Sequence, residues 1–174
     1  MFCSIDPGKT TGIALFDQFG AFKASYTLED NGAADYINKL LAFKLRYEVR
    51  FALIEMYVNF GKYRPNAFKV QEEVRFCKEV FPLHILVKTC QWNPKAYKDR
   101  MKRQMAAQYL NCVFANSHCT DAALMGKNIF DLIKVYYNGM AYSFLSDLSE
   151  GIKQFPTRQE LAEMVREKQL EKAT

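Results

Sequence analysis

The chain lacks the features that mark a membrane-spanning or secreted protein. None of its apolar runs approaches the roughly 18 to 20 residues that a transmembrane helix needs. The N-terminus has no basic segment followed by an apolar one, so it does not resemble a secretory signal. We therefore expect no contact with a membrane.

Paired cysteines are also missing. The five cysteines are an odd number, and no two of them form a C-x-x-C pair. This pattern indicates neither a disulfide framework nor a zinc ribbon. Reduced thiols predict a cytoplasmic or other reducing compartment, which includes the host cell in the case of a viral or phage protein.

The composition is that of an ordinary folded domain. The chain has 174 residues, of which 49% are hydrophobic and 25% charged, so wholesale disorder is excluded. No internal repeat or low-complexity tract occurs. The formal net charge of +5 is a mild bias toward polyanionic partners and decides nothing by itself.

Hydrophobic periodicity predicts alternating strands and helices. We expect strands over 1–7, 11–17, 21–28, 50–57 and 84–88, and helices over 33–46, 67–80, 97–110, 118–137 and 157–172. Strands come first and then alternate with helices, an order typical of an α/β fold with a mixed sheet. We divide the chain into a domain over 1–137 and a C-terminal extension over 138–174 that ends in a helix.

Acidic residues stand where they interrupt apolar patterns. Asp6 and Glu55 each end an apolar run that is predicted to be a strand, and adjacent strands place their ends within about 5 Å. Asp121 lies near the start of the helix over 118–137, and His118 is three residues earlier on the same helix face. We predict that these four side chains form one cluster.

Such a cluster suits a divalent cation. Like charges a few ångströms apart disfavour their common ionisation, and Mg²⁺ or Mn²⁺ bound to oxygen ligands removes that repulsion. Two such ions can promote hydrolysis of a phosphodiester. Each residue also has a purely structural alternative: Asp6 as a turn former, Glu55 in an ion pair, Asp121 as an acid at a helix start, and His118 as a helix cap.

Three segments in this order resemble the RuvC-type Holliday-junction resolvases of the ribonuclease H-like superfamily. They are Ser4-Ile5-Asp6-Pro7-Gly8 with Thr11-Gly12, then Leu53-Ile54-Glu55, then His118-Cys119-Thr120-Asp121-Ala122-Ala123. The resemblance covers about residues 1 to 135. It implies a five-stranded mixed sheet flanked by helices, and a homodimer that cuts paired strands of a four-way DNA junction. It further implies a catalytic, metal-binding set comprising Asp6, Glu55, His118 and Asp121, with Mg²⁺ as cofactor and Mn²⁺ as a substitute.

Aromatic and basic residues stand where the resemblance implies DNA contacts. One of Tyr57, Phe60 and Tyr63 would wedge into the junction. The predicted DNA-binding residues are Tyr57, Phe60, Lys62, Tyr63, Arg64, Lys95, Lys98, Lys102 and Arg103. The alternative for the basic residues is a solvated helix face.

We therefore expect a Mg²⁺-dependent endonuclease that resolves four-way junctions by paired phosphodiester hydrolysis. Three rival functions stay open at this point. The first is a broader nuclease for branched or flap DNA, and the second is a junction-binding protein without cleavage. The third is an ATP-binding domain of the actin and sugar-kinase type, which shares the core fold and opens with a similar Asp-x-Gly turn.

Overall fold

The structure is a computed structural model, and it describes all residues except 57–66, 93–98, 115, 138–139, 152 and 172–174. A five-stranded sheet in the order β3-β2-β1-β4-β5 forms its centre. Its strands are β1 (Phe2–Asp6), β2 (Thr10–Phe16), β3 (Phe22–Glu29), β4 (Phe51–Met56) and β5 (His84–Lys88). The first three strands pair antiparallel, and β4 and β5 continue parallel to β1. The predicted mixed α/β sheet is thereby confirmed.

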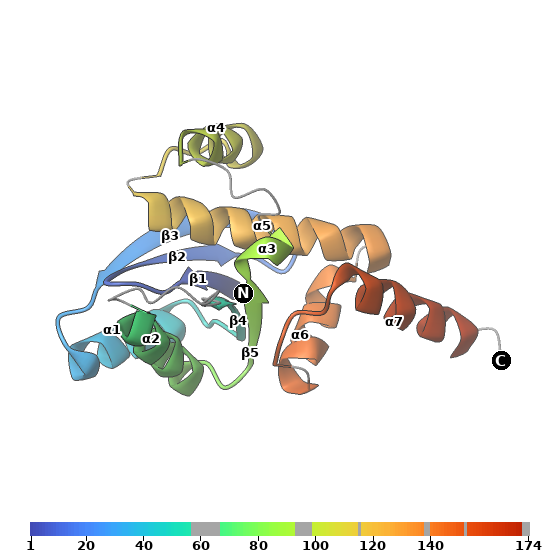
Figure 1. Ribbon diagram of the computed structural model, residues 1–174, viewed down its shortest axis with the longest axis horizontal. Helices are drawn as coiled ribbons and strands as arrows, with labels where there is room; N and C mark the ends of the chain where they lie inside the picture. The colour runs from blue at the N-terminus through green and yellow to red at the C-terminus, as the bar shows by residue number, and fades with distance from the viewer. Residues whose placement is uncertain (57–66, 93–98, 115, 138–139, 152, 172–174) are drawn as a thin grey trace.

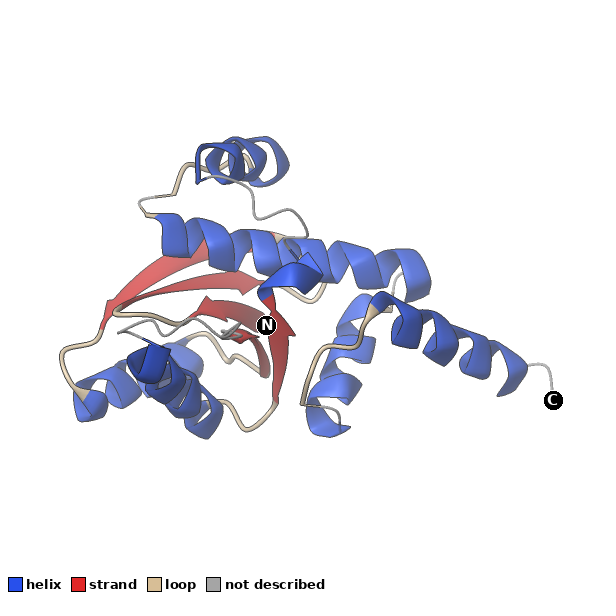
Figure 2. Ribbon diagram, viewed as in Figure 1, coloured by secondary structure: helices blue, strands red, loops and turns tan. Residues whose placement is uncertain are grey.

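Helices cover both faces of the sheet. They are α1 (Ala33–Arg46), α2 (Ala67–Val80), α3 (Thr89–Trp92), α4 (Asp99–Leu110), α5 (Ser117–Tyr137), α6 (Ala141–Gly151) and α7 (Arg158–Glu171). Helices α1 and α2 lie on one face and the long α5 on the other, with α4 stacked beyond α5 (Figure 1). Figure 2 shows the same layers by secondary structure: helix, sheet, helix.

Two helices differ from the expected pattern. Helix α3 (Thr89–Trp92) follows β5 directly and lies outside the helices expected from the sequence. Helix α6 lies in the C-terminal extension, where only the terminal helix was expected. Helix α5 begins at Ser117, so Asp121 is its fifth residue and no acidic residue lies in the first turn. A purely helix-dipole role for Asp121 is thus disfavoured, because that effect fades beyond the first turn.

Alternation along the central strands divides the core in two. Phe2 of β1 with Phe51 and Leu53 of β4 face α5, whereas Ile5 and Ile54 face α1 and α2. Because side chains alternate with a period of two, the residues that follow on the α5 side of β1 and β4 are Asp6 and Glu55. The apolar pattern of each strand therefore directs its terminal carboxylate toward α5.

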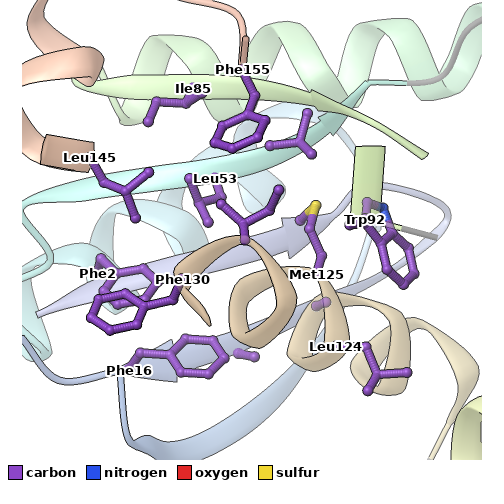
Figure 3. Close-up of a cluster of buried hydrophobic side chains, with 14 of the residues drawn as sticks. Phe2, Phe16, Leu53, Ile85, Trp92, Leu124, Met125, Phe130, Leu145 and Phe155 are labelled. Atoms are coloured by element: carbon purple, nitrogen blue, oxygen red, sulfur yellow. The ribbon is translucent and has the colours of Figure 1, made fainter. Parts of the chain in front are cut away.

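An aromatic cluster fixes α5 on the sheet. The Phe2 ring stacks on the rings of Phe16 and Phe51, with centroids 5.0 and 5.3 Å away, and on Phe130 of α5 at 5.6 Å. Figure 3 shows the rings of Phe2, Phe16 and Phe130 close together, with Leu53, Ile85 and Phe155 farther along the same buried cluster. Offset aromatic pairs of this kind add to the burial of apolar area.

The C-terminal extension contributes to the same core. Leu145 of α6 and Phe155 are buried in the cluster on the α5 side of the sheet. The backbone N–H of Phe155 donates to the carbonyl of Leu86 at 2.8 Å, so this segment lies along β5. Thr157 and Glu160 form a capping box at the start of α7, with reciprocal bonds of 2.6 and 3.3 Å. Among the described residues, no helix has the length and apolarity to cross a bilayer.

Candidate active site

Strand register brings Asp6 and Glu55 together. In the parallel pair of β1 and β4, Ser4 is opposite Leu53 and Ile5 is opposite Ile54. One further step along both strands places the Asp6 and Glu55 carboxyl groups side by side, and the two share a hydrogen bond. The predicted juxtaposition of these strand-end acids is thus present in the structure.

A glycine allows α5 to reach this edge. Gly12 is opposite Asp6 in the β1–β2 hairpin. A Cβ atom at Gly12 would lie 2.2 Å from the backbone carbonyl of His118, so only glycine permits the start of α5 to lie here. His118 Nδ1 consequently lies 2.7 Å from Asp6 Oδ2. The hydrogen bond to Asp6 raises the pKa of His118, although partial burial opposes the rise.

Asp121 is paired with a lysine from another helix. The Lys102 ammonium of α4 lies 2.8 Å from Asp121 Oδ2, and both side chains are largely buried, at 13% and 17% exposure. The same ammonium lies 5.5 Å from the centre of the Trp92 ring. This pair brings a positive charge into the cluster and ties α4 to α5.

Glu55 is held by two donors from α3. Thr89 Oγ1 donates to Glu55 Oε1 at 2.6 Å, and Trp92 Nε1 donates to the same oxygen at 3.3 Å. Burial is the largest cause that raises the pKa of Glu55, to about 8, and the charge of Asp6 is the next. A pKa of this size shows that the site disfavours a second negative charge.

One cavity joins these groups. It has a volume of about 640 Å³. The turn after β1 and the N-terminal half of α2 supply its remaining walls. The lining residues are Asp6, Pro7, Gly8, Lys9, Thr10, Glu55, Lys69, Val70, Glu73, Thr89, Lys102, His118 and Asp121. All four predicted site residues therefore line a single cavity.

The donor chemistry of this cavity fits a divalent cation. Asp6, Glu55 and Asp121 supply carboxylate oxygens, and the raised pKa of Glu55 indicates that a positive ion would stabilise the cluster. Within the residues that the structure describes, however, no three His, Cys, Asp or Glu side chains are arranged to hold a metal ion. The carboxylates are instead paired with His118, Lys102 and the α3 donors.

Most of the predicted DNA-binding residues lie outside the described part of the chain. These are Tyr57, Phe60, Lys62, Tyr63, Arg64, Lys95 and Lys98. Arg103 is within α4, and Lys102 points into the cavity toward Asp121. The DNA-binding role of this set stays a prediction.

Several residues that shape the site escaped the sequence patterns. The Asn116 side chain caps α5 by accepting from the Cys119 N–H at 2.8 Å, a role for which His118 was an alternative. Buried Tyr36 shares a 2.8 Å hydrogen bond with Thr11 Oγ1, which donates to the Gly8 carbonyl at 2.9 Å and so braces the turn after Asp6. For Glu73, the only signal in the sequence is that an acidic residue falls on the apolar face of α2.

Comparison with known proteins supports the fold. A scan against family models finds no match, and a search of curated proteins finds none either. Among solved structures, RuvC of Thermus thermophilus in complex with a Holliday-junction substrate is similar, with a TM-score of 0.64 and 11% identity, over 78% of this chain and 96% of that one. Another Thermus thermophilus RuvC structure gives a TM-score of 0.61 and 12% identity, over 79% and 96% of the two chains. The chain thus has a RuvC-type fold, an α/β architecture of the ribonuclease H-like kind.

Proposed function

We propose that the protein is a divalent-metal-dependent endonuclease that cuts four-way DNA junctions, acting as a homodimer. The observation that carries this proposal is the convergence of Asp6, Glu55, His118 and Asp121 in one cavity at the ends of β1 and β4. The likeness to a RuvC solved with a Holliday-junction substrate supports the choice of substrate. Phosphate groups of DNA also suit the net charge of +5.

The side chains present would divide the work among them. Asp6, Glu55 and Asp121 would hold Mg²⁺ or Mn²⁺, which would supply positive charge at the scissile phosphate and acidify a bound water. Thr89 and Trp92 hold the Glu55 carboxyl in one orientation, and Lys102 does the same for Asp121. His118 would exchange a proton with the reacting groups, and its hydrogen bond to Asp6 supports this role because that bond raises the pKa of His118 and favours the protonated imidazole.

The first experiment tests Asp6. We expect Asp6→Asn to abolish nicking of a synthetic four-way junction in Mg²⁺ and to leave junction binding in EDTA within about threefold of wild type, because phosphate contacts supply most of the affinity. Asp147→Asn, at an exposed position of α6 outside the cavity, is the matched control. An Asp6→Asn variant that cuts as fast as wild type would show that the metal model is wrong.

The choice of substrate decides among the rival functions. Junction, flap and linear duplex are compared at one salt concentration, because electrostatic affinity varies steeply with salt. Equal cleavage of flap and junction would favour a broader branched-DNA nuclease, and junction binding without cleavage in Mg²⁺ or Mn²⁺ would favour a recognition protein. ATP hydrolysis without DNA cleavage would favour the actin and sugar-kinase type.

A further inference from the structure

A buried carboxyl group in the wall of the cavity has no role in the site described so far. Glu73 of α2 is 1% exposed, and neither of its carboxyl oxygens has a hydrogen-bond partner among the residues that the structure describes. It lines the same cavity as Asp6, Glu55 and Asp121. Buried polar groups are normally hydrogen-bonded, so a glutamate held in this state calls for a functional explanation.

The charged neighbours of Glu73 come from several elements. Lys69, one turn earlier on α2, forms a 2.9 Å ion pair with Asp30 from the segment before α1. Glu72 adds a further negative charge from α2, and His118 of α5 adds a positive influence across the cavity. The neutral side chains of Tyr36 and Cys77 lie on the inner side, where the charge of Glu73 also affects both.

These surroundings favour the protonated form of Glu73. Burial is the largest cause that raises its pKa, to about 7, and Asp30 is the second. Lys69 lowers the pKa but does not cancel these effects, since its ammonium is bound to Asp30. At neutral pH the group therefore exchanges its proton readily.

A role as an additional metal ligand is less consistent with the contacts. Asp30 is the acidic side chain with the largest influence on Glu73, but one of its oxygens binds Lys69 and the other accepts from the Gly32 N–H at 2.8 Å. Both oxygens of Asp30 are thus already bound, which disfavours an ion shared between Asp30 and Glu73. A phosphate entering the cavity would instead repel ionised Glu73 and accept a hydrogen bond from the protonated acid.

We propose that Glu73 is a general acid of this cavity, which gives its proton to the leaving oxygen of the phosphodiester. The inference rests on the proposed nuclease function. In the step, the oxygen of an attacking water forms a bond to phosphorus as the bond from phosphorus to the 3′-oxygen breaks. The 3′-oxygen takes the Glu73 proton and leaves as a hydroxyl, the proton of the water passes to solvent, and solvent reprotonates Glu73.

The test is the pH dependence of cleavage by Glu73→Gln. With excess enzyme on a four-way junction in Mg²⁺, we expect a loss of about 100-fold at pH 6.5, a size typical of general acid catalysis. The loss should shrink toward threefold or less at about pH 9, because wild-type Glu73 is then ionised and also lacks the proton. Junction affinity in EDTA should stay within about twofold, since the substitution removes no phosphate-binding cation. Glu79→Gln, the same change at an exposed position of α2 outside the cavity lining, is the control and should cut like wild type.

Other outcomes separate this inference from the proposed function. If Glu73→Gln lowers the cleavage rate by the same factor at every pH, Glu73 has a structural role and the inference is overturned. Cleavage by Glu73→Gln at the wild-type rate at every pH would also overturn it. In both cases the proposed nuclease function stands. If wild type cuts no branched DNA, the proposed function fails and the inference fails with it. Glu73→Asp retains a carboxylic acid, so its cleavage rate should still fall as the pH becomes alkaline, even if Glu73→Gln lowers thermal stability. A Glu73→Asp variant whose rate does not fall at alkaline pH would overturn the inference.

Discussion

Glu55→Gln provides a quantitative test of the electrostatics of the site. The folded protein raises the pKa of Glu55 from its ordinary 4.5 to about 8, through burial first and the charge of Asp6 second. Glutamine has the shape of the protonated acid. Its carbonyl oxygen can still accept from Thr89 and Trp92, and its amide can donate to Asp6. The substitution therefore removes the ionisation and keeps the contacts.

The sign and size of the effect follow from proton linkage. The unfolded carboxyl loses its proton near pH 4.5 and the folded one near pH 8, so the stability due to this group is complete below 4.5 and declines as pH rises to 8. At about 1.4 kcal/mol for each pH unit, the difference sets a ceiling of about 5 kcal/mol. Water that enters the cavity screens Asp6, so we expect about 2 to 3 kcal/mol.

The assay is urea unfolding in EDTA at pH 5 and pH 9. At pH 5 we expect Glu55→Gln and wild type to agree within about 0.5 kcal/mol, and at pH 9 we expect the variant to be more stable by about 2 to 3 kcal/mol. Glu29→Gln, at the exposed end of β3 and outside the cavity, is the control. Comparison of the variant with wild type at each pH cancels the titration of Glu73, which both proteins share. The titration of His118 cancels only in part, because the charge of Glu55 contributes to the raised pKa of His118.

Magnesium extends the same test. If Glu55 helps to bind the ion, Mg²⁺ should stabilise wild type more than Glu55→Gln at pH 9, where the carboxylate is available. A free-energy difference between variant and wild type that is the same at both pH values would refute the reasoning. So would a variant that is less stable than wild type at pH 9.

Two further substitutions test the packing around the cavity. Gly12→Ala should destabilise the protein by about 3 kcal/mol in urea unfolding, because the new methyl group would overlap the His118 carbonyl. Gly151→Ala, whose methyl group would meet open space, is the control and should be nearly neutral. Equal effects of the two substitutions on the free energy of unfolding would contradict the explanation. Lys102→Met should cost about 1 to 3 kcal/mol in EDTA, because it removes the ammonium bound to largely buried Asp121, and Mg²⁺ should restore part of the loss. A stability equal to that of wild type would exclude an energetic role for this ion pair.

The core of the site was predictable because it depends on local patterns. The alternation of Phe51, Leu53 and Glu55, together with that of Phe2, Ser4 and Asp6, requires each acid to share a face with its apolar neighbours. Once β1 and β4 are neighbours, this period brings the carboxyl groups together without further information. The helix over 33–46 was predictable for a similar reason, because its apolar residues follow the helical period.

Other parts of the site depend on contacts that no local pattern encodes. In the sequence, Lys102 is one of several cations in a basic helix. Only the packing of α4 on α5 brings it to Asp121. Thr89 carries no signal of its own, and its bond to Glu55 arises because α3 follows β5 directly beside β4. Helix α6 was missed because burial of Leu145 and Leu148 depends on the sheet residues that cover them.

The sequence alone therefore determined which strands form, which faces they bury and which carboxyl groups end them, since these follow from periods of two and 3.6 residues. Only the tertiary structure decided how those charges are neutralised and oriented. Lys102, His118 and the α3 donors reach the acids from elements that are distant in the chain, and burial changes the pKa of Glu55 and Glu73. Electrostatic energies depend on separation and solvent exposure, which exist only once the elements have packed.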